Sequence, residues 1–325
     1  MMSHEFPIGQ SESALAMIMR AELMQGDRVI AAAGPILRQL LAYDGHALFS
    51  DEVIARIRGM VTHCARQILH ELAAVLAADG GTPIDREAFV QKSEAALAAP
   101  LIEDAAFLAH AHTLVLEAQL AERLHQRSGI DPVLCALVQE LAASSDPEKA
   151  GLAMQVLAAQ ARFVQHQRRM EWPIGELPGD LFHKAMLVLQ TTDIAEAEFL
   201  AATQQRMRES YDESRRRVSL ITRLIMSMNG KAGRSLALDH AGLGIFVTAL
   251  AMASDQNREI AVMAVCDNQF ARLALSLRAA GLGQREVEKQ FVYLHPLIDL
   301  PTGFETVRPD DAARLLASSD TEMLS

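Results

Sequence analysis

The chain contains 325 residues, of which 50% are hydrophobic and 22% are charged. This apolar content is sufficient for a folded core and excludes an intrinsically disordered chain. Thirty basic and 41 acidic residues give a formal charge of −11, which argues against a nucleic-acid-binding protein, because a phosphate backbone requires a basic face. Ala and Leu dominate, aromatic residues make up only 5%, and no stretch alternates apolar with polar residues. We therefore expect an all-α protein built of antiparallel helix pairs.

The stretch 53–76 carries the clearest helical pattern. Its apolar residues recur at steps of three and four, so they form one narrow stripe on a helix that turns 100° per residue. Ser50 and Asp51 precede it as candidate N-caps. The pattern predicts an amphipathic helix that packs on a core. The stripe consists of Val53, Ile57, Val61, Cys64, Ile68, Leu72 and Val75.

Several helix starts are predicted from a capping side chain that precedes a proline. Proline suits the first helical position, because no hydrogen-bond donor is needed there and its φ is already helical. We expect such starts at Thr82-Pro83, Asp131-Pro132 and Asp146-Pro147, and further starts at Asp180, at Ser254-Asp255 and at Pro309.

Histidines and cysteines offer no convincing metal or redox site. His63 and His70 are predicted to share a solvated helix face, and two ligands are too few for zinc. On a helix, His110 and His112 point about 200° apart, so they cannot chelate one ion. Glu122 and His125 form a single ExxH motif, whereas di-iron bundles use a pair of them. Cys64, Cys135 and Cys266 are far apart and are interpreted as small buried thiols in a reducing cytoplasm.

No catalytic signature stands out. Gly230-Lys231 lacks the remainder of a phosphate-binding loop, and neither HExxH nor GxSxG occurs. The sequence therefore predicts no enzyme, no catalytic or metal-binding residue and no cofactor.

The segment 163–183 is the most distinctive part of the chain, because it gathers two arginines, the only tryptophan, two prolines and three acidic residues. Trp and Arg are favoured anchors of protein interfaces. Two interpretations are equally compatible with this pattern. The segment contacts a partner protein, or it is an inter-helix loop that Trp172 holds against the core. The candidate interaction residues here are Arg168, Arg169, Trp172, Glu176 and Asp180.

Residues 196–228 contain neither Pro nor Gly and have apolar ends around a polar middle. Such a segment is either one bridging helix or two helices broken near Ser210–Ser214. Arg206, Arg215, Arg216 and Arg217 add candidate interaction residues. The apolar residues Leu200, Met207, Val218, Ile221, Ile225 and Met228 predict a homodimer through 196–228, unless they pack within their own chain.

One short repeat is visible, because Ala241-Gly-Leu-Gly244 recurs as Ala280-Gly-Leu-Gly283. The spacing is close to the period of HEAT-like helical repeats, which is about 40–47 residues. We expect HEAT-like irregular repeats in an N-terminal helical domain, 1–190, and a C-terminal helical domain, 191–325, or in one continuous array.

Three stretches carry a family resemblance. AQARFVQHQRRMEWPIGELPGDLFHKAM, HAGLGIFVTALAMASDQNREIAVMAV and ARLALSLRAAGLGQREVE resemble an alphaproteobacterial, sphingomonad-type branch of a family catalogued as domain of unknown function 2336. The resemblance covers roughly Leu48 to Pro296. It implies an all-helical, HEAT-like cytoplasmic protein with no assigned reaction and no catalytic residues.

These features favour a non-enzymatic scaffold or regulatory protein that binds a protein partner, because stacked helices create extended surfaces. The alternative is a small-ligand sensor or enzyme with a site in a helical cleft, and a deep pocket lined by ionisable groups would favour it. The first ten residues lack the pattern of a secretory signal. The longest apolar run, Ala241–Ala253, is too short to span a bilayer. We therefore expect a cytoplasmic protein without a membrane span.

Overall fold

The computed structural model describes residues 14–42, 51–78, 85–266 and 268–323. Every regular element in these ranges is an α-helix or a short 3-10 helix. The all-α prediction is therefore confirmed. Within the described ranges, no helix is both long enough and apolar enough to cross a bilayer.

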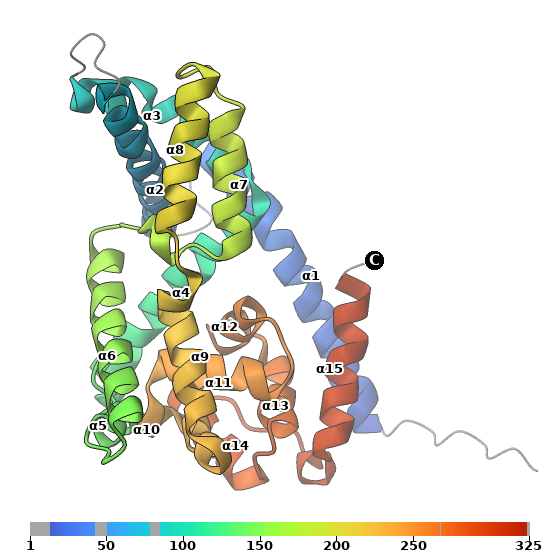
Figure 1. Cartoon of the computed structure of the whole chain (residues 1–325). Helices are drawn as coiled ribbons and strands as arrows, with labels where there is room; N and C mark the ends of the chain where they lie inside the picture. The colour runs from blue at the N-terminus through green and yellow to red at the C-terminus, as the bar shows by residue number, and fades with distance from the viewer. Residues whose placement is uncertain (1–13, 43–50, 79–84, 267, 324–325) are drawn as a thin grey trace, which may run out of the picture.

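The helices form two tiers (Figure 1). The upper tier contains α2 (Asp51–Ala78), α3 (Arg86–Glu103), α7 (Gly179–Gln190) and α8 (Ala197–Ser210). The lower tier contains α5 (Ala136–Ala142), α6 (Pro147–Arg168), α9 (Arg217–Ser227), α10 (Leu238–Ala241), α11 (Leu243–Ala253), α12 (Arg258–Cys266), α13 (Phe270–Ala279), α14 (Gln284–Leu294) and α15 (Pro309–Met323). Short 3-10 helices are η1 (Ile174–Glu176), η2 (Glu213–Arg215), η3 (Asn229–Leu236) and η4 (Phe304–Thr306).

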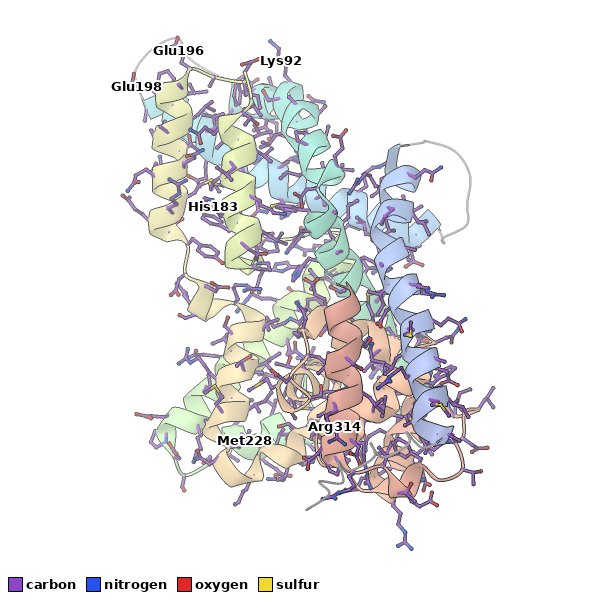
Figure 2. All side chains as sticks on the ribbon, turned by 90° about the vertical axis from the view of Figure 1, so that its right-hand side faces the viewer. Lys92, His183, Glu196, Glu198, Met228 and Arg314 are labelled. Carbon is purple, nitrogen blue, oxygen red and sulfur yellow. The ribbon has the colours of Figure 1, made fainter. Side chains whose placement is uncertain are left out.

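Two long helices, α1 (Ala14–Ala42) and α4 (Ala105–Ser128), run through both tiers. Figure 2 shows the same division from the side, with Glu196, Glu198 and Lys92 at the outer end of the upper tier and Met228 and Arg314 in the lower tier. Each long helix therefore contributes side chains to two separate regions of packing.

The tiers have separate hydrophobic cores. We call the cluster around α2, α3, α7 and α8 the upper core, and the cluster around α6, α9 and α11–α15 the lower core. In α4, Val115 belongs to the upper core and Leu120 to the lower core, so the change occurs within about one turn. The predicted domain division near residue 190 falls between α7 and α8, which pack on each other. The division into two domains stays a prediction.

The apolar stripe predicted at 53–76 lies inward on α2. Val53, Ile57, Val61, Cys64, Ile68 and Leu72 are buried, and Val75 is half-buried. Burial raises the pKa of the Cys64 thiol to about 12, which agrees with an inert buried thiol. Cys135 is also buried, whereas Cys266 is half-buried.

Two of the predicted helix starts are confirmed: Asp146 caps α6 through the amides of Glu148 and Lys149, and α15 begins at Pro309. Asp131 is wrong as a helix start, because its carboxylate caps the turn at Val133 and Leu134, and α5 begins only at Ala136.

Two further predicted helix starts are displaced along the chain, and two cannot be compared because they fall outside the described residues. Ser254 donates to the Leu250 carbonyl and ends α11, so α12 begins later, at Arg258. Helix α7 begins at Gly179, which places Asp180 in its first turn. Ser50 and Thr82-Pro83 lie outside the described residues.

The segment 196–228 is broken, as the second of the two alternatives predicted. Helix α8 ends at Ser210, and Asp212 accepts a hydrogen bond from the Ser214 amide to start η2, before α9 begins at Arg217. The apolar residues at both ends pack within their own chain. Those that are buried are Leu200, Met207, Ile221, Ile225 and Met228.

In both Ala-Gly-Leu-Gly sequences the first glycine lies between two helices and has a positive φ. Gly242, between α10 and α11, has φ 71°, and Gly281, between α13 and α14, has φ 91°. This left-handed region favours glycine, because a Cβ atom would be strained there. The two sequences share this positive φ, but α11 begins directly after Gly242 and α14 begins three residues after Gly281. The HEAT-like repeat stays a prediction.

Candidate functional site

Besides α1, the chain crosses between the tiers at three places that converge: the middle of α4, the segment 169–178, and the segment 211–216. Charged and polar side chains gather at these crossings, between the two hydrophobic cores. We call this junction the seam. Its central residues are Glu117 on α4, Gln160 on α6, Arg217 on α9 and Arg258 on α12.

Glu117 and Arg217 form a buried, bidentate ion pair. The Arg217 guanidinium donates to both carboxylate oxygens of Glu117, at 2.7 and 2.8 Å, and the two side chains are only 3% and 2% exposed. Arg258 donates a further hydrogen bond to Glu117 at 3.0 Å. Such planar, two-point pairing is the strong form of the arginine–carboxylate interaction.

Two arginines keep the Glu117 carboxylate ionised despite its burial. Burial alone raises its pKa, but the charges and hydrogen bonds of Arg217 and Arg258 outweigh that effect and lower the pKa to about 2. At neutral pH Glu117 is therefore a fixed negative charge and not a proton acceptor.

The Arg217 guanidinium makes two further contacts. It donates to the Gln160 amide oxygen at 2.9 Å, and it stacks over the Phe163 ring at 3.8 Å from the ring centroid. Gly244 of α11 lies close by, because a Cβ added there would be 2.7 Å from the Gln160 amide nitrogen and 3.2 Å from the Arg217 guanidinium. Glycine at 244 therefore allows α11 to approach the ion pair.

The two crossing segments cap each other's helices. The Glu176 carboxylate accepts from the Arg217 amide at the start of α9, at 2.9 Å. Conversely, the Glu213 carboxylate accepts from the Gly179 amide at the start of α7, at 3.3 Å, and pairs with Arg216 at 2.7 Å. These caps satisfy exposed backbone amides and place carboxylates at helix N-termini, which is electrostatically favourable.

Trp172 is fixed by a set of hydrogen bonds from α2. Its amide donates to Nδ1 of His63 at 3.1 Å, and its carbonyl accepts from Gln67 at 2.9 Å. The indole is 2% exposed and stacks on His110, with 5.5 Å between ring centroids. His110 in turn contacts Glu259 of α12 at 2.5 Å. The prediction that His63 lies on a solvated face is therefore wrong, because His63 accepts from the crossing segment, whereas His70 is exposed.

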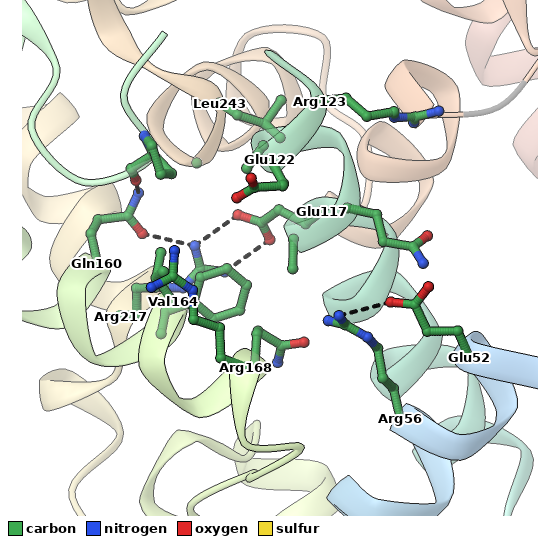
Figure 3. Close-up of a pocket in the computed structure, with 17 residues that line it drawn as sticks. Glu52, Arg56, Glu117, Glu122, Arg123, Gln160, Val164, Arg168, Arg217 and Leu243 are labelled. Carbon is green, nitrogen blue, oxygen red and sulfur yellow. Dashed lines mark hydrogen bonds and ion pairs between the residues drawn. The ribbon is translucent and has the colours of Figure 1, made fainter. Parts of the chain in front are cut away.

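A pocket of about 480 Å³ opens at the seam (Figure 3). Its floor is the Glu117–Arg217–Gln160 cluster, and its walls come from α2, α4, α6 and α11. Arg56 and Glu52, which pair at 2.8 Å, close one side. Apolar contacts come from Phe163, Val164 and Leu243. The size is that of a pocket for a small organic molecule.

Two residues that line this pocket each carry a buried polar atom without a hydrogen-bond partner in the described part of the chain: Oε1 of Gln167 and Nε of Arg56. Gln167 is 4% exposed, and its amide nitrogen contacts only the Met60 sulfur, at 3.7 Å. Buried polar groups are almost always satisfied in native proteins, so such atoms beside a cavity point to a ligand.

The structure separates the predicted interaction residues into two groups. Arg168, Arg169, Asp180, Arg206 and Arg215 are exposed, and Arg206 pairs with Glu71 at 3.4 Å. The inward-facing residues are Trp172, Glu176, Arg216 and Arg217. As surface anchors for a partner, Trp172, Arg216 and Arg217 are wrong, because the chain buries all three at the seam.

Sequence reasoning missed Glu117, Gln160, Gln167 and Arg258. Glu117 could have been identified from the sequence, because it is the only charged residue in the otherwise apolar run Leu114–Ala118. An isolated charge on a buried helix face requires a partner. Gln160 and Gln167 gave no such signal, because glutamine on a surface helix is unremarkable.

Of the remaining motifs, Glu122 and His125 are exposed, and Glu122 also lines the seam pocket (Figure 3). Gly230-Lys231 lies in η3. Among the residues that the structure describes, no group of three or more His, Cys, Asp or Glu side chains is arranged to hold a metal ion.

No protein-family model, curated protein or solved structure matches this chain. The resemblance to the family of unknown function, the HEAT-like repeat and the cytoplasmic location therefore stay predictions from the sequence.

Proposed function

We propose that this protein is a regulatory ligand-binding protein that holds a small molecule in the seam pocket. The observation that carries the proposal is a cavity of about 480 Å³ whose floor is a buried, fully paired ionic cluster. A pocket lined by ionisable groups is the feature that distinguishes a small-ligand sensor from a pure scaffold.

The lining favours binding over catalysis. The residues that form the pocket include no Ser, Thr, Cys, His, Lys or Tyr among those the structure describes. Glu117 is held ionised by two arginines, so it is poorly suited to accept a proton at neutral pH. This chemistry supports a protein that recognises its ligand without transforming it.

The position of the pocket suggests how binding acts on the molecule. The walls combine α2 of the upper tier with α6 and α11 of the lower tier. A ligand that contacts both tiers stabilises one arrangement of them relative to others. Ligand binding thereby changes the surface that the two tiers present together, and a protein partner can bind one arrangement of that surface in preference to another.

The proposal is tested by thermal unfolding in the presence of a library of metabolite-sized molecules. A ligand at a hundred times its Kd adds about 2.7 kcal/mol to the free energy of unfolding, which raises Tm measurably. Ala118 lines the pocket, so Ala118→Phe is expected to fill it and remove the Tm increase. The control, Ala201→Phe, changes an exposed alanine on α8 and retains it. A Tm increase that survives Ala118→Phe would contradict the proposal.

A protein scaffold is the second candidate, and an exposed apolar face of α1 favours it. Ile18, Val29 and Ile36 are 56%, 50% and 42% exposed. They lie 11 and 7 residues apart, which is close to whole numbers of helical turns, so they share one face. Affinity capture with the intact chain, compared with an Ile18→Lys, Val29→Lys variant, tests whether this face binds a partner protein.

The homodimer through 196–228 stays a proposal, but the apolar residues that predicted it no longer support it. The apolar ends are buried within the chain, so only polar contacts from Arg206, Arg215 and their acidic neighbours support it. Light scattering decides the question, because a mass near 35.5 kDa would exclude the dimer.

A further inference from the structure

We propose that the ligand of the seam pocket is a small organic anion whose acidic group is held by Arg168 and whose hydrogen-bond donor is held by Gln167. This inference rests on the proposed function and specifies the chemistry of its ligand.

The charges of the pocket favour an anion. Glu117 is neutralised by Arg217 and Arg258, and Glu52 is paired with Arg56. The other charged residues of the lining are Glu122, which accepts a hydrogen bond from Gln126, and Arg123 and Arg168, so the lining keeps one positive charge in excess. Arg168 pairs with no acidic side chain in the part of the chain that the structure describes, and it lines the pocket from the last turn of α6. In Figure 3 its side chain extends along the pocket wall toward Gln160. A free guanidinium at the mouth of a pocket is suited to a carboxylate or phosphate, which it can grip through two hydrogen bonds.

Arg56 offers a second donor from another side of the pocket. One of its terminal nitrogens is committed to Glu52, while its Nε is buried without a partner. Arg56 lies across the pocket from the Arg168 side chain (Figure 3), so a second polar group of the ligand, and not its acidic group, would satisfy this donor.

Gln167 defines a different part of the ligand. Its Oε1 is a buried acceptor without a partner, and leaving such a group unsatisfied is unfavourable. A hydroxyl or amine group on the ligand would supply the missing donor. Between these polar ends, Phe163, Val164 and Leu243 provide an apolar surface, so the ligand is an organic molecule and not an inorganic ion.

The test compares 3-(4-hydroxyphenyl)propionate with its neutral amide, by NMR titration of the intact chain. The probe carries a carboxylate, an apolar body and a hydroxyl donor. We expect the acid to bind about tenfold or more tightly than the amide, because a charge-assisted hydrogen bond is lost in the amide. Inorganic phosphate serves as a third arm, and we expect it to bind more weakly than the acid.

Two adjacent arginines provide a matched pair of variants. Arg168→Gln is expected to weaken binding of the acid about tenfold and to leave the amide unchanged. Arg169→Gln changes an equally exposed neighbour that faces a different groove, beside Gly59 and Met170, and is expected to leave both affinities unchanged. Gln167→Leu is expected to weaken the acid and the amide alike, since both carry the hydroxyl.

The outcomes separate this inference from the proposed function. Equal binding of acid and amide, or equal effects of the two arginine variants, would overturn the anionic ligand and leave the pocket as a binding site. Phosphate binding as tight as that of the acid would show recognition of the anion alone and would overturn the organic ligand. If neither acid nor amide binds, the inference is wrong, and the library experiment with Ala118→Phe still decides the proposed function.

Discussion

At the scale of single residues, the chain depends on a charge where a hydrophobic residue would be expected. Glu117 lies on α4 between Val115 of the upper core and Leu120 of the lower core. Its burial is tolerated because Arg217 and Arg258 donate three hydrogen bonds to it. The pair joins α4 to α9 at the position where both cores end.

Replacing this carboxylate is expected to destabilise the whole fold. In Glu117→Gln two arginines remain buried without their counter-charge, which costs about 3–5 kcal/mol of unfolding free energy. Chemical denaturation measures the change. The control Glu122→Gln alters an exposed glutamate on the same helix and is expected to stay within about 0.5 kcal/mol of wild type. Equal effects of the two variants would contradict a stabilising role for the buried pair.

The same carboxylate predicts a pH dependence. The pKa of Glu117 falls from its ordinary 4.5 to about 2 in the folded chain, so its stabilising contribution is complete above about pH 4.5 and is lost as pH falls toward 2. The wild-type chain should therefore lose this contribution between pH 4.5 and 2, and Glu117→Gln should lack that component of the slope. Parallel acid profiles of the two proteins would show that Glu117 is not the group responsible.

At the scale of helices, the approach of α11 to α6 and α9 depends on Gly244. An added Cβ would lie 2.7 Å from the Gln160 amide nitrogen and 3.2 Å from the Arg217 guanidinium. Because these two groups hydrogen-bond each other, neither can move without disturbing the ion pair. The absence of a side chain at Gly244 therefore determines both how closely the lower-tier helices pack and where Gln160 and Arg217 lie in the pocket floor.

Gly244→Ala is expected to destabilise the chain by about 1–3 kcal/mol, the usual cost of overpacking a filled site. Gly151→Ala is the matched control, because Gly151 lies inside α6 with no atom within 4 Å of an added Cβ. Alanine there should stabilise the helix by about 0.4–1 kcal/mol. Thermal unfolding measures the change in stability of both variants, which we expect to be of opposite sign. If Gly244→Ala leaves the stability unchanged, α11 does not approach the ion pair as closely as described.

The helices themselves were largely predictable, because caps and periodicity act locally. The stripe on α2 and the cap at Asp146 are examples, and both follow from spacing alone. Asp131 failed because the same side-chain hydrogen bonds that cap a helix also cap a turn. The site was not predictable, because Glu117, Gln160, Arg217 and Arg258 come from four helices that only the tertiary fold brings together.

At the scale of the whole molecule, two separately packed tiers are joined by α1 and by three crossings at the seam, one of which is the middle of α4 (Figure 1). The crossing segments are locked by reciprocal caps, through Glu176 and Glu213. The seam pocket contacts both tiers, so a ligand bound there acts on the junction and not on one tier alone.

The most direct measurement is hydrogen–deuterium exchange, followed by mass spectrometry, with and without 3-(4-hydroxyphenyl)propionate. We expect slower exchange in the segments that meet at the seam, namely the middle of α4, the end of α6, the 169–178 crossing and the start of α9. Exchange in α13 and α15, which pack together away from the pocket, should be unchanged. Slower exchange confined to α13 and α15, or unchanged exchange at the seam under saturating probe, would contradict the account.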